Sequence, residues 1–191
     1  ALNSASTTIR NSYITNIKAI GQETQAIAGW NGPGPFLIAN NYLEAAGINI
    51  LFGGAEPHIP SLVPSDIVVR WNEISKPLAL RNGKWTVKNL FELKNARGVR
   101  VEGNLFQRNW AAAQSGFAIL LTVRNPGGTA PWSTVEDVTF QNNIVRSVAG
   151  GLNILGYDTN NPSGQTRRIV IRNNLFEDVS RTNWGGPGTF L

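Results

Sequence analysis

The chain has 191 residues, of which 41% are hydrophobic and 15% are charged, so it has enough apolar material for one folded domain. This composition excludes a disordered polyelectrolyte, and no apolar run is long enough to span a membrane. Cysteine is absent, which excludes disulfides and thiolate metal sites. The net charge of +5 comes from scattered Lys and Arg residues, without the basic run typical of nucleic-acid binding; such a balance mostly serves solubility and also suits an acidic partner.

Six short stretches of the chain follow one pattern: an apolar residue, a variable one, Asn or a substitute, Asn, a variable residue and an apolar one. They span residues 9–14, 38–43, 69–74, 101–106, 140–145 and 171–176. The fourth position of the pattern is Asn in five copies and Ser12 in the first, with spacings of 29, 31, 32, 39 and 31 residues. A period in this range indicates a repeat architecture.

Apolar and polar residues alternate before the shared Asn. In the fourth copy, for example, Val99 and Val101 precede Asn104, and Phe106 follows it. A period of two indicates a strand with one buried face. Asn tolerates left-handed backbone angles, so we expect each copy to be one short strand that bends at the shared Asn and continues to face the core.

A second strand is predicted later in each repeat, often directly after a Gly that suits a tight corner. The predicted second strands are 25–28, 48–52, 90–94, 117–123 and 152–155, and a sixth begins at Thr189. Antiparallel hairpins would need two-residue turns, whose signals are sparse here. Strands that recur in parallel without helices between them are therefore expected to wind into a solenoid of six turns, with the shared Asn residues stacked as an internal ladder. The expected ladder consists of Asn41, Asn72, Asn104, Asn143 and Asn174.

These tandem V-x-V-x-x-N-x-F units resemble the right-handed parallel β-helix of the pectate-lyase-like superfamily, from Thr7 to Phe176. The stretch from Phe91 to Asn104 is similar to an uncharacterised bacterial group within it. The resemblance implies an all-β, right-handed parallel β-helix of about six turns. It would form a single domain over residues 1–191, secreted to an extracellular or periplasmic location. The superfamily includes polysaccharide lyases, glycoside hydrolases, uronate epimerases, esterases, phage tailspikes and adhesins, so the fold alone does not decide the function.

Loops that leave one corner of a solenoid become neighbours. The predicted loops at 30–35, 53–64, 125–133 and 156–166 are long, whereas the crossing at 95–98 is short. We therefore expect a notch about 10 Å wide over the short crossing. Its floor and walls would carry Lys94, Arg97, Arg100, Glu56, His58, Arg124 and Trp132.

A cationic floor with an acid, an imidazole and an aromatic wall could hold an acidic sugar. We expect His58, Glu56 and Arg97 as catalytic residues, and Lys94, Arg100, Arg124 and Trp132 as substrate-binding residues. The triplet Glu56-Pro57-His58 resembles the Asp-Pro-His motif of alginate epimerases, with Glu in place of Asp and in a loop rather than on the helix body. The alternative is that all seven are ordinary solvated side chains.

Acidic residues are few, and Asp66, Asp137, Asp158 and Asp178 are far apart along the chain. Without three carboxylates on successive turns, neither a Ca²⁺-dependent lyase nor a hydrolase is favoured, and we expect no metal and no cofactor. A second corner is predicted to carry Lys76, Lys84, Trp85, Trp110, Arg146, Arg181 and Trp184, which either bind a partner or cover an apolar flank.

The leading hypothesis is a carbohydrate-associated β-helix that binds or processes an acidic polysaccharide, with no nucleic-acid or membrane partner. The alternative is a non-catalytic solenoid: an adhesin, a scaffold or an engineered fragment. The missing initial Met, and a chain end inside a repeat, lead us to expect a fragment or trimmed product.

Overall fold

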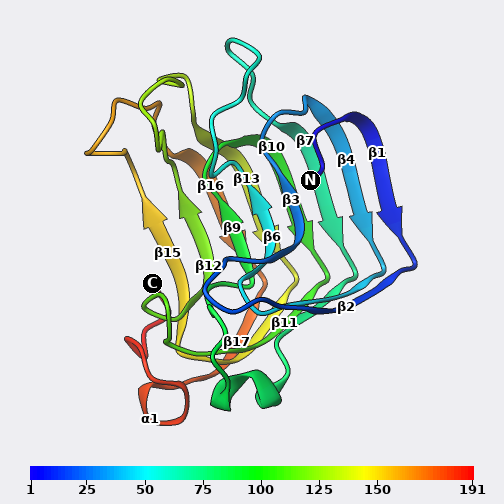
Figure 1. Ribbon diagram of the computed structural model, residues 1–191, viewed down its shortest axis with the longest axis vertical. Helices are drawn as coiled ribbons and strands as arrows, with labels where there is room; N and C mark the ends of the chain where they lie inside the picture. The colour runs from blue at the N-terminus through cyan, green and yellow to red at the C-terminus, as the bar shows by residue number, and fades with distance from the viewer.

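The computed structural model describes residues 1–191 and shows a parallel β-solenoid of about six turns, which confirms the predicted fold class. Three parallel sheets form its walls (Figure 1). Sheet 1 consists of β1 (Ala5–Arg10), β4 (Gly34–Ala39), β7 (Ser65–Arg70), β10 (Ala96–Glu102), β13 (Val135–Gln141) and β16 (Arg167–Arg172). Sheet 2 consists of β2 (Tyr13–Ile17), β5 (Tyr42–Ala45), β8 (Glu73–Ser75), β11 (Leu105–Asn109), β14 (Ile144–Val148) and β17 (Leu175–Val179).

Sheet 3 consists of β3 (Gln25–Gly29), β6 (Ile48–Phe52), β9 (Phe91–Leu93), β12 (Phe117–Thr122) and β15 (Gly150–Leu155), which are the predicted second strands. The predicted sixth one also begins, because Gly151 N donates to Thr189 O at 2.9 Å and Leu152 N donates to Phe190 O at 2.7 Å. Two short helices, η1 (Leu78–Asn82) and α1 (Arg181–Trp184), complete the chain, and neither has the length or apolar character to cross a membrane.

Each repeated stretch is two strands rather than the single bent strand expected from its sequence. The chain turns from sheet 1 into sheet 2 within it, as from β10 to β11. The prediction that the shared Asn itself takes the left-handed angle is wrong. The residue before it does so, for example Asn40 with φ 54° and Asn142 with φ 55°. The shared Asn is thereby left free to point its amide inward.

The predicted Asn ladder is confirmed. From Asn72 onward, each ladder side-chain oxygen accepts two hydrogen bonds from the preceding rung: Asn104 Oδ1 accepts from Asn72 N at 2.9 Å and from Asn72 Nδ2 at 2.9 Å. The same geometry joins Asn104 to Asn143 and Asn143 to Asn174. In the first turn, Ser12 N donates to Asn41 Oδ1 at 3.0 Å.

The core is one column of apolar side chains that the three sheets enclose. Inward positions repeat in register, so that Ile67 pairs with Val99 and Val99 with Val138 along sheet 1. Phe106 and Phe140, from neighbouring turns, pack against each other with ring centroids 5.6 Å apart and planes tilted by 31°. Since the inward positions of the strands are apolar and the amides of the ladder bond to one another, chemistry is left to the outward faces and to the loops.

Candidate functional site

The predicted site residues lie around the corner where sheet 3 leads into sheet 1, but they divide between two faces. Lys94 follows β9 and Arg124 lies just beyond β12, and both line the outer face of sheet 3. Arg97 and Arg100 lie in β10 and are exposed on the outer face of sheet 1. The structure therefore does not gather the expected floor residues on one surface.

The remaining three predicted residues belong to the long loops at this corner, which gather at the top of Figure 1. Trp132 Nε1 donates to Leu62 O at 3.0 Å, and Gly127 N donates to Glu56 Oε1. The long loops thus contact each other, because they fold toward one another over the short crossing, and the open notch expected from loop lengths is bridged. His58 is exposed on its loop.

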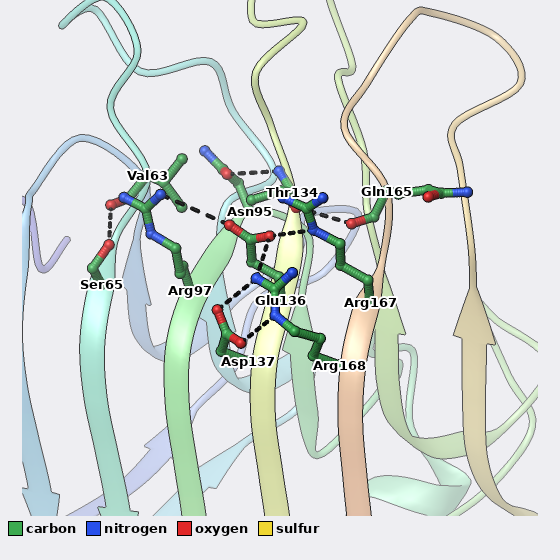
Figure 2. A network of polar contacts seen from close by, with 10 residues as sticks. All are labelled: Val63, Ser65, Asn95, Arg97, Thr134, Glu136, Asp137, Gln165, Arg167 and Arg168. Atoms are coloured by element: carbon green, nitrogen blue, oxygen red, sulfur yellow. Dashed lines mark hydrogen bonds and ion pairs between the residues drawn. The ribbon is translucent and has the colours of Figure 1, made fainter.

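On the sheet 1 side of the loops, one buried carboxylate gathers three arginines (Figure 2). Glu136 Oε2 accepts from Arg167 Nε at 2.6 Å and from Arg168 Nη2 at 2.9 Å, and Arg97 Nη1 lies 3.7 Å from Glu136 Oε1. Arg168 also donates to Asp137, and this hydrogen bond lowers the pKa of the Asp137 carboxyl. The charge of Arg97 is therefore part of an ion-pair network across β10, β13 and β16.

On the other side, a groove of about 420 Å³ lies on the outer face of sheet 3 and includes side chains from β9, β12 and β15. We call it the sheet 3 groove. It brings together two of the predicted substrate-binding residues, Lys94 and Arg124. Its full lining is Glu92, Lys94, Gln114, Ser115, Leu120, Thr122, Arg124, Asn153 and Leu155.

Glu92 is the unusual member of the sheet 3 groove. Its strand neighbours at the same height are Leu51 on β6 and Leu120 on β12, both apolar, and Glu92 is only 1% exposed. Lys94 Nζ lies 3.5 Å from Glu92 Oε1, while Glu92 Oε2 has no hydrogen-bond partner. A buried, unpartnered carboxylate oxygen costs free energy, so it is a candidate for contact with a bound molecule.

Burial raises the pKa of the Glu92 carboxyl, and the nearby charge of Lys94 only partly opposes this effect. The other charged groups that act on Glu92 are Glu23, which raises its pKa, and Lys88, which lowers it. Glu23 and Lys88 are themselves joined by an ion pair. Glu92 therefore holds a proton at a higher pH than an ordinary glutamate.

We expect the Glu92→Gln variant to be as stable as the wild type or more stable at neutral pH. A carboxyl whose pKa is raised by folding destabilises the fold above its unfolded pKa, and this penalty disappears as the pH falls through the raised pKa. Any gain from Glu92→Gln should therefore fade in mildly acidic buffer. Urea unfolding at neutral and acidic pH measures the difference in unfolding free energy between the variant and the wild type.

The matched control is Glu177→Gln, at an exposed position of β17, which should leave the unfolding free energy within about 0.5 kcal/mol of the wild type at both pH values. A clear loss of stability for Glu92→Gln at neutral pH would contradict a penalised buried carboxylate.

Arg124 at the far end of the groove is held by a buried acid. Its Nη1 lies 3.4 Å from Oδ1 of Asp158, which is 2% exposed. Asp158 Oδ2 also accepts from Asn125 N at 2.9 Å. Asp158 thus fixes both the side chain and the backbone beside the groove.

At the second predicted corner, the tryptophans cover an apolar flank. Trp110 is 4% exposed and packs with Leu80 and Val87, and Trp85 and Trp184 pack against this cluster. These contacts support the interpretation that the Trp residues cover an apolar flank of the solenoid. Lys76 at the same corner is fully buried.

Sequence reasoning missed Glu92 and Glu136, the two carboxylates around which the two faces are arranged. Each stands at an outward position of a strand, Glu92 between Phe91 and Leu93 and Glu136 after Val135. For Glu92, a charged residue between two core residues was the available signal, whereas Glu136 is followed by the exposed Asp137 and has no such signal. The side chains that bury Glu92 and Glu136, however, belong to neighbouring turns of the solenoid.

No group of three or more His, Asp or Glu side chains is gathered where it could hold a metal ion. Comparison of the chain with protein-family models, curated proteins and solved structures finds no match. Its function is therefore inferred from the geometry of the two faces.

Proposed function

We propose that the protein binds an acidic polysaccharide in the sheet 3 groove, outside the cytoplasm. The observation that carries the proposal is the placement of Lys94 and Arg124 in one groove beside the buried carboxyl of Glu92. Lys and Arg side chains form charge-assisted hydrogen bonds with carboxylates. The raised pKa of Glu92 limits its repulsion of an acidic ligand.

The composition of the groove suits a sugar polymer. Gln114, Thr122 and Asn153 offer hydrogen-bonding groups, and Leu120 and Leu155 offer apolar surface. Because the groove follows successive turns, a chain lying along the solenoid axis crosses a new strand about every 4.8 Å, although the side chains in register differ, as Glu92, Leu120 and Asn153 do. The elongated shape along three strands favours an extended ligand over a compact one.

We also propose that the chain is a member of the pectate-lyase-like superfamily. The parallel solenoid and its Asn ladder support this assignment together with the repeated V-x-V-x-x-N-x-F unit. Ligand binding is the part of the function that the groove supports most directly; processing of the bound polysaccharide is the further possibility that an activity assay decides.

A non-catalytic solenoid, such as an adhesin or scaffold, is the second candidate. It is favoured by the separation of the three predicted catalytic residues: Arg97 pairs with Glu136, Glu56 contacts Gly127, and His58 lies exposed on a loop. Unsaturated products or new reducing ends from a panel of polyuronates would exclude this candidate. If activity appears, His58→Ala tests whether that residue takes part.

We expect the Lys94→Met and Arg124→Met variants each to bind an oligogalacturonate hexamer at least about tenfold more weakly, since a hydrogen bond to a charged group contributes about 1.5–3 kcal/mol. The chemical shifts of the backbone amides of Leu120 and Thr122, which line the groove, measure the loss at low salt, with cellohexaose as the neutral comparison. Arg97→Met, on the other face, is the matched control and should leave the affinity unchanged. Weakened binding in Arg97→Met alone would move the site to sheet 1.

A further inference from the structure

Trp71 occupies a position at which the other turns have small or flexible residues. It is the left-handed residue between β7 and β8, with φ 58°. The equivalent corner residues, all with positive φ, are Asn11, Asn40, Gly103, Asn142 and Asn173. Gly and Asn tolerate this backbone conformation, whereas a bulky side chain is a genuine outlier in it. Backbone conformation therefore disfavours Trp at this corner.

Burial does not explain the tryptophan either, because Trp71 is 60% exposed. A large apolar side chain that is both strained and exposed contributes little to the fold. Strained residues of this kind persist at ligand-binding positions, where the conformation itself is used. The outlier at Trp71 thus points to a role in recognition.

The indole of Trp71 is held in place by its neighbours. The Arg70 guanidinium carbon lies 4.4 Å from the ring centroid, within the range of a cation–π contact. In the next turn, a Cβ on Gly103 would lie 2.7 Å from Trp71 Cδ1, so only glycine lets the indole occupy this place. The aromatic surface is therefore positioned before any ligand arrives.

A depression of about 370 Å³ adjoins this corner on the outer face of sheet 1. Arg70 lines it together with Arg100 and the acid Asp66, and Leu37 and Val68 provide apolar surface there. Arg70 Nε is buried and has no hydrogen-bond partner. The ion pairs on this face use other groups: Arg97, Arg167 and Arg168 with Glu136, and Arg100 with Glu102.

We propose that Trp71 and Arg70 form a second carbohydrate-contact site, at the corner between sheets 1 and 2, that takes the pyranose ring of an acidic sugar. The indole would stack on the apolar C–H face of the ring, and the guanidinium of Arg70 would bind its carboxylate. The site lies on a different face from the sheet 3 groove and stands without it.

The discriminating variant is Trp71→Asn, which installs the residue found at four of the equivalent corners. Since Asn suits the left-handed conformation, the melting temperature should stay equal or rise by up to about 3 °C. Binding at the corner should nevertheless weaken at least about tenfold, as expected for a Trp at the centre of a contact. The indole N–H resonance of Trp71, assigned by its absence in the variant, reports occupancy directly.

In the wild type, an oligogalacturonate hexamer should shift this resonance more strongly than cellohexaose does, and Arg70→Gln should remove the preference for the acidic oligomer. Lys94→Met should leave the shift of the Trp71 resonance intact. If the oligomer shifts the Trp71 resonance but does not bind in the sheet 3 groove, the groove proposal fails and the Trp71 site stands. The proposal is overturned if neither oligomer moves the resonance at millimolar concentration. It is equally overturned if Trp71→Asn lowers the melting temperature by more than about 3 °C, since Trp71 would then be structural.

Discussion

The Lys76→Met variant is expected to lose about 3–5 kcal/mol of unfolding free energy, or to fail to fold, because it leaves several buried oxygen acceptors without a donor. Lys76 is fully buried, and its Nζ donates to three backbone oxygens, Ala45 O at 3.0 Å, Ala46 O at 3.0 Å and Gly47 O at 2.7 Å. Methionine fills similar space but leaves these acceptors without the ammonium.

The surroundings of Lys76 decide its charge. Burial lowers the pKa of the Lys76 ammonium. Against this, four oxygens surround Nζ, three carbonyls and Asn49 Oδ1 at 2.9 Å, and the three N–H groups of an ammonium satisfy more of them than the two of a neutral amine. We infer that Lys76 is the cap that ties the end of β5 to the start of β6.

Chemical denaturation followed by circular dichroism measures the loss. Lys84→Met is the matched control at the same corner, because Lys84 is exposed and its replacement should change stability by less than about 0.5 kcal/mol. Equal stability of the Lys76 and Lys84 variants would show that the buried ammonium makes no net contribution.

The second large effect is expected from Asn104→Ala, in the middle of the ladder. Asn104 Nδ2 donates to Val69 O at 2.9 Å and to Asn143 Oδ1 at 3.0 Å, and its Oδ1 accepts both hydrogen bonds from Asn72. With several buried polar groups left unpaired at about 1–3 kcal/mol each, we expect a loss of about 3–4 kcal/mol after partial relaxation. Urea unfolding measures this loss of free energy, and hydrogen exchange at Asn72 N reports the broken hydrogen bond directly.

Asn174→Ala provides the graded comparison, since Asn174 is the last rung and only half-buried. Water can replace part of its hydrogen bonding, so its loss should be about half that of Asn104→Ala. A solenoid is stabilised turn by turn, and a central defect should also reduce the cooperativity of unfolding. Equal losses at both rungs would contradict a ladder whose strength follows burial.

The sequence by itself determined the repeating framework of this protein. Period-two alternation and the recurring Asn gave the strands of sheets 1 and 3, the parallel winding and all five rungs of the ladder. These features are local patterns copied once per turn. Stacking identical positions at one strand spacing then leaves little freedom in where they meet.

Only the tertiary structure decided how individual side chains are used. The loop contact between Trp132 and Leu62, which bridges the expected notch, joins residues 70 positions apart. The burial of Glu92 and of Lys76 depends on neighbours from other turns, as does the room that Gly103 leaves for Trp71. Burial, pKa and exposure are set by contacts between turns. A repeat pattern fixes which turns are neighbours, but not how far each variable side chain or loop reaches across them.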